Sequence, residues 1–440
     1  LLNLPTKIIP ALILGALTFS LFKFLTASEA DSYAFSLDTR IAGFIQKIRN
    51  NWSFIFVIIY ALSQLSIILV NPVSEIYVDW WNIDFPNWLR LIGAFLSVTF
   101  LPGYAILSMV NKTKEISKIA KILFSFLLSL FITSLTAFLL NPIFHISFSY
   151  FLPAIVVVNF ILIIVFSYMT FFKRKEYESK ATATVYSNIK LPKVSFYGNL
   201  SLLLCFVLLL SGVYIVFFSQ TSALRGDMWD HMQRAMLFYK DSVNYPNQNL
   251  QLGGDVSSIM DVPYWFHIYL ASFFSVSGIP PMNSYIILAF LNALFMFPPY
   301  LVSTAFFKER KKPAVLSTII FSIFGGFGWV YVLYLKTQAT YPISTVSWVN
   351  ILENAIQKTA EDVYANLSFF FLEFKTRTIS LISLFTIVYL MIEKKLSNTF
   401  KAFMITIAIA VGYLFHVAEI LIFVITFLPC SLLFSKKIST

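Results

Sequence analysis

Stretches of about 20 mostly apolar residues recur along the whole chain, and they limit the possible fold more than any other feature. A helix of that length crosses the hydrocarbon core of a bilayer, because it satisfies all of its backbone hydrogen bonds internally. Hydrophobic residues make up 58% of the 440 residues and charged residues 12%, whereas a soluble domain is about 25% charged. The sequence therefore predicts an all-α, polytopic membrane protein.

We assign about eleven transmembrane helices to these stretches. The first apolar stretch is not bounded by a small-residue cleavage pattern, so we interpret it as a span and not as a signal peptide. The stretch at 379–392 is short, and its helix is expected to begin a few residues earlier. The predicted spans lie near 8–26, 53–71, 88–110, 119–140, 150–172, 198–218, 284–306, 314–334, 379–392, 402–416 and 418–434.

One further apolar stretch, residues 263–279, allows two topologies. If it crosses the membrane, the basic cluster at 308–312 lies opposite the Lys-rich loop at 173–193. If it is interfacial or re-entrant, all of the basic clusters lie on one side, which is the cytoplasmic side by the positive-inside rule. We prefer this second topology, which puts the loops 72–87, 219–283 and 335–378 outside. The net charge of +11 then reflects cytoplasmic loops and does not indicate nucleic-acid binding.

The chain is expected to have three parts. Residues 1–172 form an N-terminal five-span membrane block, which carries the sequence LPGY inside a span. Residues 173–197 form a basic cytoplasmic connector, and residues 198–434 form a second membrane domain with the outer loops 219–283 and 335–378. The two cysteines, Cys205 and Cys430, both lie in apolar stretches, so the sequence indicates no disulfide framework and no CxxC site.

The segment that follows the span 198–218 carries the densest group of reactive side chains. Asp227, Asp230, His231 and Arg234 are spaced at i, i+3, i+4 and i+7, so they share one face of a helix, and Arg225 precedes them. Two interpretations stay open. The helix is a surface helix with a solvated polar face and an N-capping Asp227, or a carboxylate acts as a general base or a metal ligand.

Five other outer residues are candidates for binding a substrate. His267 lies in the predicted non-spanning helix, Lys375 and Arg377 precede a span, and His416 and Glu419 lie between the last two spans. Ionisable residues that lie close to the hydrocarbon core of a membrane are candidates for functional sites. The structural alternatives are a packed histidine at 267, basic side chains that extend to headgroups at 375 and 377, and a structural pair at 416 and 419.

From about Thr221 onward, and over roughly residues 198–434, the chain resembles membrane glycosyltransferases of the GT-C class. The resemblance rests on the acidic helix GDMWDHMQRAMLFYK, the proline-aromatic segment DVPYWFHIYLASFFSVSGIPP and the span end LVSTAFFKERKK. It implies a plasma-membrane enzyme that takes a sugar from a polyprenyl-phosphate carrier at the extracytoplasmic face. The block 1–172 is similar to an uncharacterised group of prokaryotic membrane proteins.

The resemblance, together with the chemical needs of a lipid-linked donor, suggests roles for the candidates. It implies Asp227 as the catalytic base and Asp230 as a weaker match for that position; His231 would orient the acceptor with Asp230. Residues expected to bind the donor phosphate or the substrate are Arg225, His267, Lys375, Arg377, His416 and Glu419. The expected partners are membrane lipid, a polyprenyl-phosphate-linked sugar and a glycan, lipid or protein acceptor. No metal site and no cofactor are predicted, with a divalent metal as the alternative. A transporter or flippase, or a non-catalytic membrane subunit, remains the rival.

Overall fold

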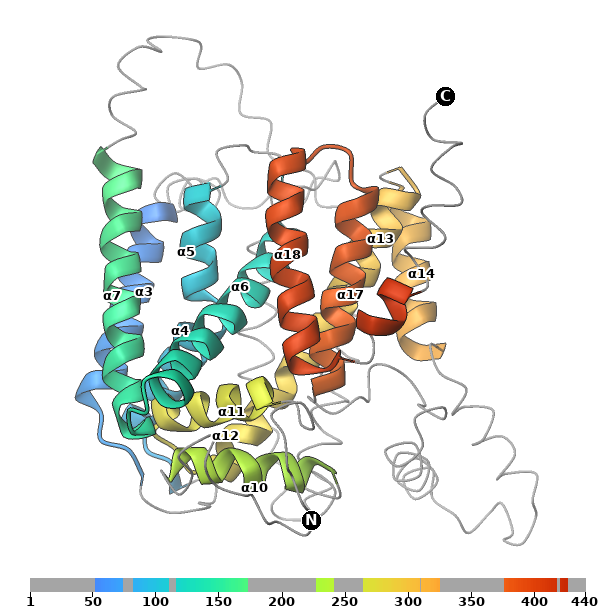
Figure 1. Cartoon of the computed structure of the whole chain (residues 1–440). Coiled ribbons are helices and arrows are strands. Elements are labelled where there is room, and N and C mark those ends of the chain that lie inside the picture. The colour runs from blue at the N-terminus through green and yellow to red at the C-terminus, as the bar shows by residue number, and fades with distance from the viewer. Residues whose placement is uncertain are drawn as a thin grey trace, which may run out of the picture. The chain divides into compact units, whose positions relative to one another are not determined.

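The structure is a computed structural model whose regular elements, within the part of the chain that it describes, are all helices (Figure 1). The all-α class is therefore confirmed for that part. Three helices there are long and apolar enough to cross a membrane, and the bent pair Phe85–Thr99 and Leu101–Val110 makes a fourth if it forms one span. The total of eleven spans stays a prediction, because those at 8–26 and 198–218 lie outside the described residues. The described ranges are 52–73, 82–110, 116–172, 227–240, 264–308, 310–324, 376–417 and 420–425.

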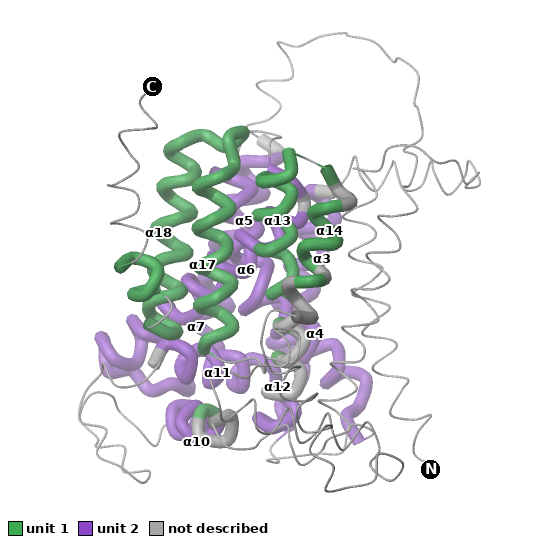
Figure 2. The backbone as a smooth tube through the Cα atoms, turned by 90° about the vertical axis from the view of Figure 1, so that its right-hand side faces the viewer, with its two compact units in different colours: residues 1–18, 201–231, 286–440 green, residues 19–200, 232–285 purple. Residues whose placement is uncertain are grey.

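The chain folds into two compact units, which Figure 2 shows in different colours. Unit 1 contains residues 1–18, 201–231 and 286–440, and unit 2 contains residues 19–200 and 232–285. Unit 2 therefore joins helices of the N-terminal block to the segment Met232–Tyr285, which includes the later part of the acidic helix. The predicted connector at 173–197 lies outside the described residues, and the three-part division stays a prediction.

Unit 2 contains most of the described helices. Two of its α-helices begin at a side-chain cap: the Asp84 carboxylate accepts from the Asn87 N–H, and the Ser117 hydroxyl accepts from the Ala120 N–H. Such caps satisfy backbone donors that have no partner within the helix. The elements are α3 (Trp52–Leu69), α4 (Phe85–Thr99), α5 (Leu101–Val110), α6 (Lys118–Phe138), η2 (Leu139–Ile143), η3 (Phe148–Tyr150), α7 (Phe151–Ser167), η4 (Tyr168–Phe172), most of α10 (Asp227–Tyr239), α11 (Tyr264–Ser277) and the first part of α12 (Pro281–Leu288).

Three predicted spans match single candidate spans. The stretch 119–140 corresponds to Ile119–Ile143, the stretch 150–172 corresponds to Phe148–Thr170, and the stretch 402–416 corresponds to Asn398–Phe415. The stretch 88–110 instead forms α4 and α5, which meet at Phe100 with a bend of 40°. The sequence LPGY therefore starts a new helix after the break.

Gly103 of the LPGY sequence allows α5 to approach α6 closely. A Cβ atom at this position would clash with the Ser125 carbonyl oxygen and come within 2.8 Å of the Ser129 nitrogen. The Gly103 N–H also donates to the Ser129 hydroxyl over 2.8 Å. Small residues allow such backbone contact between membrane helices, so the glycine of LPGY serves helix packing.

Substituting Gly103 by alanine is expected to destabilise unit 2, because the added methyl group must push α5 away from a neighbouring backbone. Overpacking of this kind costs about 1–3 kcal/mol. Denaturant unfolding of the purified protein in detergent measures the loss. The variant Ser108→Ala changes an exposed position of the same helix and should unfold like the unchanged protein. Equal stability of G103A and S108A would contradict the packing role.

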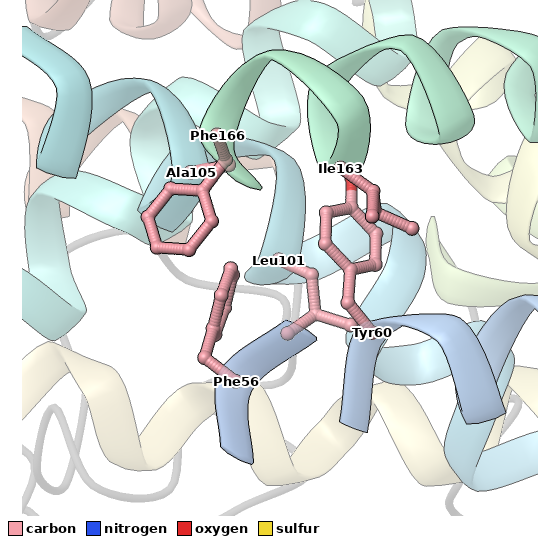
Figure 3. Packing of buried hydrophobic residues seen from close by; sticks show 6 residues of the cluster. All are labelled: Phe56, Tyr60, Leu101, Ala105, Ile163 and Phe166. Atoms are coloured by element: carbon pink, nitrogen blue, oxygen red, sulfur yellow. The ribbon is translucent and has the colours of Figure 1, made fainter. Parts of the chain in front are cut away.

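A chain of buried polar side chains links α3, α7 and α4. The Tyr60 hydroxyl donates to Asn159 Oδ1 over 2.7 Å, Asn159 Nδ2 donates to Gln64 Oε1 over 3.3 Å, and Gln64 Nε2 donates to the Ser97 hydroxyl over 2.6 Å. The Tyr60 ring itself packs in the apolar cluster of Figure 3. Polar groups in an apolar environment require such partners. This series of hydrogen bonds therefore fixes α3, α4 and α7 relative to one another.

The predicted non-spanning helix is present as α11. Its 14 residues extend about 21 Å, which is less than the thickness of about 30 Å that a span must cross. It packs against α4, α6 and α7 of unit 2, and it runs across the direction of α7 in Figure 1. Phe266, Tyr269 and Phe273 are all fully buried. Because α11 is buried around its circumference, it is not a surface helix with one wet face, which favours the re-entrant alternative.

In unit 1, α17 (Thr376–Ile392) and α18 (Asn398–Phe415) form an antiparallel hairpin (Figure 1). The other elements are the end of α12, the 3-10 helix η6 (Ala289–Met296), α13 (Phe297–Phe306) and α14 (Lys311–Phe324), and α13 packs on both α14 and α17. The predicted span 284–306 is thus a series of three helical segments and not one helix. The helix predicted at 379–392 does begin earlier, since α17 is Thr376–Ile392, and α18 is Asn398–Phe415.

Candidate functional site

One end of the α17–α18 hairpin in unit 1 brings two predicted site residues together. Arg377 lies in the first turn of α17, and His416 directly follows the last residue of α18. The two helices are antiparallel, so these positions share one end of the hairpin. The Ser380 hydroxyl, one turn after Arg377, donates to the His416 carbonyl oxygen over 2.9 Å. We call Arg377, Ser380 and His416 the hairpin site.

The local backbone explains how the hairpin site forms. His416 leaves the helical conformation with φ −161° and ψ 105°, and its N–H still donates to the Gly412 carbonyl oxygen. Gly412 lies close to Ile420, and a Cβ atom there would come within 2.6 Å of Ile420 Cδ1. The glycine therefore lets the segment after His416 pack back against α18. Glu419, the predicted companion of His416, lies outside the described residues.

Arg377 is the one cation among the described residues of the hairpin site. Arg377 is half-buried at the N-terminus of α17, where the helix dipole also favours a negative charge. α18 is long and apolar enough to cross a membrane, and His416 directly follows its last residue. Lys375, which precedes Arg377, lies outside the described residues.

Substituting Ser380 by alanine is expected to loosen the hairpin site, because the His416 carbonyl oxygen loses its donor from α17. A bond of this kind contributes about 1 kcal/mol, which thermal or denaturant unfolding in detergent can measure. The control is Ser383→Ala on the same helix, whose hydroxyl donates to the Ile379 carbonyl oxygen of its own helix. If both variants lose the same stability, the bond between the two helices has no special role.

The helix predicted from Asp227 is present as α10, Asp227–Tyr239. His231 is only 6% exposed, so the interpretation of a fully solvated polar face is wrong at this position. Met232, Ala235 and Phe238 are buried as well. The side chains of Asp227 and Asp230, and all of Arg225, lie outside the part that the structure describes.

His267 lies in α11 of unit 2 and is 2% exposed. Its ring centroid is 6.2 Å from that of Phe266. This burial among aromatic side chains favours the packing alternative for His267. His267 belongs to unit 2, whereas Arg377 and His416 belong to unit 1. The proposed contact of His267 with a substrate stays a prediction.

The described residues contain no group of three or more His, Cys, Asp or Glu side chains that could hold a metal ion.

A contact between two hydroxyl groups connects α11 and α4 in unit 2: the Tyr269 hydroxyl of α11 lies 3.3 Å from the Thr99 hydroxyl of α4. Either hydroxyl can be the donor in this contact. The contact ties the middle of α11 to α4.

Sequence reasoning did not single out Arg90 of α4, which is 2% exposed. Its Nε donates to the Val276 carbonyl oxygen over 3.1 Å, and its Nη1 donates to the Val70 carbonyl oxygen. Next to it, the Val73 N–H donates to the Gly278 carbonyl oxygen over 2.7 Å. We call these five residues the Arg90 clasp. The sequence feature that could have identified Arg90 is its position as a lone cation inside the predicted span 88–110, since such a residue is a functional candidate by default.

The charge of Arg90 is balanced by helix ends. Val70 directly follows α3, and Val276 lies in the last turn of α11. Carbonyl groups at the C-terminus of a helix have no partner within it and carry the negative end of its dipole. Within the described ranges, these two carbonyls are the hydrogen-bond acceptors of the guanidinium.

Comparisons of the chain with protein-family models, with curated proteins and with solved structures found no match.

Proposed function

We propose that the chain is a membrane glycosyltransferase that moves a sugar from a polyprenyl-phosphate donor to an acceptor at the extracytoplasmic face of a prokaryotic plasma membrane. The hairpin site is the observation that carries this proposal. It combines a guanidinium, a helix N-terminus and a histidine at the end of a candidate span. A lipid-linked donor has its phosphate at that depth and its apolar chain in the bilayer.

The residues divide between two roles. Arg377, with Arg225 and Lys375, binds the donor phosphate and stabilises the negative charge that it gains as it leaves. Asp227 takes the proton of the acceptor hydroxyl, while Asp230 and His231 orient the acceptor. The acceptor oxygen then bonds to the anomeric carbon as the bond from that carbon to the phosphate oxygen breaks. The confirmed helix from Asp227 supports this assignment, since one helix holds all three of these residues.

A second candidate, a transporter or flippase, is favoured by a different observation. The bend of 40° between α4 and α5 breaks a span, and the buried chain through Tyr60, Asn159 and Gln64 crosses the same unit. Broken helices with polar groups inside the membrane are typical of transporters. Sugar transfer in vesicles, compared with movement of the intact lipid between leaflets, separates this candidate from the enzyme and from a non-catalytic subunit.

Substituting Asp227 by asparagine is expected to reduce sugar transfer about 100-fold or more, because a general base contributes that much to a reaction rate. The assay follows a radiolabelled polyprenyl-phosphate sugar with the purified protein in nanodiscs. The control Lys240→Gln removes one charge at the exposed far end of α10 and should retain activity. Full activity of D227N would exclude Asp227 as the base.

Substituting Arg377 by glutamine is expected to weaken donor binding about 10-fold or more, since a hydrogen bond to a charged group contributes about 1.5–3 kcal/mol. Direct binding of polyprenyl phosphate in nanodiscs measures this effect without turnover. Lys394→Gln is the matched control, because it removes an exposed cation at the opposite end of the hairpin. Equal affinities of R377Q and K394Q would contradict a donor-phosphate site at Arg377.

A further inference from the structure

We propose that Arg90 is a positioning residue, which sets the place of α11 and of the α10 end packed on it by joining the C-terminal ends of α3 and α11. The expected effect of Arg90 on catalysis rests on the proposed function, whereas its expected effect on the position of α11 does not. The proposal follows from three features of the Arg90 clasp.

The first feature is that one side chain serves two helix ends. α4 supplies the guanidinium, and the acceptors belong to the ends of α3 and α11, at Val70 and Val276. A guanidinium has five N–H donors in a fixed planar arrangement, so it can bond two carbonyls from different directions. α11 is short and buried all round, and its terminal carbonyls need a partner from elsewhere in the chain.

The second feature is that the chain after α11 is built around the guanidinium. Gly278 has a φ of +69°, and a Cβ atom at this position would overlap Arg90 Nε and Cδ. Only glycine combines this conformation with such a close approach at little cost. The Gly278 carbonyl oxygen also accepts from the Val73 N–H, so the segments that follow α3 and α11 are joined directly as well.

The third feature connects the clasp to α10. The Tyr239 ring, at the end of α10, packs edge-on against Phe274 of α11 with a centroid distance of 6.3 Å and an angle of 89°. Phe274 lies two residues before Val276, whose carbonyl Arg90 binds. A shift of the α11 end therefore moves the end of α10, the helix that begins at the proposed base Asp227.

Hydrogen exchange of the full chain in nanodiscs tests the clasp directly. R90Q is expected to raise the amide exchange of residues 264–277 at least 10-fold, with the exchange of residues 119–138 in α6 unchanged. G278A is expected to give the same pattern, because its methyl group displaces the guanidinium. Arg310→Gln removes an exposed arginine and should change neither region. Exchange in R90Q that is unchanged, or raised equally in both regions, would overturn the proposal.

Steady-state sugar transfer tests the consequence for catalysis. R90Q is expected to lower kcat at least 10-fold while the donor KM changes less than 3-fold, because the proposed donor contacts are at other residues. R90K keeps the charge but not the planar donors, so it should recover part of the kcat. An unchanged kcat in R90Q, or no recovery in R90K, would contradict the positioning role. If the unchanged protein shows no sugar transfer, the proposed function fails. The hydrogen-exchange result alone then decides whether Arg90 positions α11.

Discussion

The carbonyl groups at helix ends impose the constraint on which the described structure depends. In an apolar environment, a helix end leaves carbonyls without partners unless a side chain or a neighbouring segment reaches them. Unit 2 meets this requirement with Arg90, which bonds the ends of α3 and α11. Unit 1 meets it with Ser380 of α17, which bonds the carbonyl of His416 after α18. Arg377, which is proposed to bind the donor phosphate, lies on α17, one of the helices held in this way.

Local features of the sequence predicted a large part of the fold. The length and hydropathy of the stretches 119–140, 150–172 and 402–416 predicted three long apolar helices correctly, and the spacing after Asp227 predicted the helix α10. Long-range contacts could not be predicted in this way. Arg90 and Val276 are 186 positions apart, and the buried state of His231 has no local signal. The break within 284–306 did have one, because the pair Pro298 and Pro299 lies in the first turn of α13.

For the candidate site, the sequence proposed individual residues but could not show which of them lie close together. The structure joins Arg377 and His416 because two antiparallel helices begin and end at the same level. His267 belongs to the other unit and is buried among aromatic side chains. The polar chain through Tyr60 and Asn159 was not expected, because each of its members looks like an isolated polar residue in an apolar stretch.

The central claim is that the phosphate of a lipid-linked sugar binds at the end of the hairpin that holds Arg377 and His416. Photo-crosslinking with a polyprenyl phosphate that carries a diazirine next to the phosphate tests it most directly. Peptide mapping should then find the label in residues 376–380 and 412–417. Labelling confined to the opposite end of the hairpin, around residues 392–398, would contradict the claim.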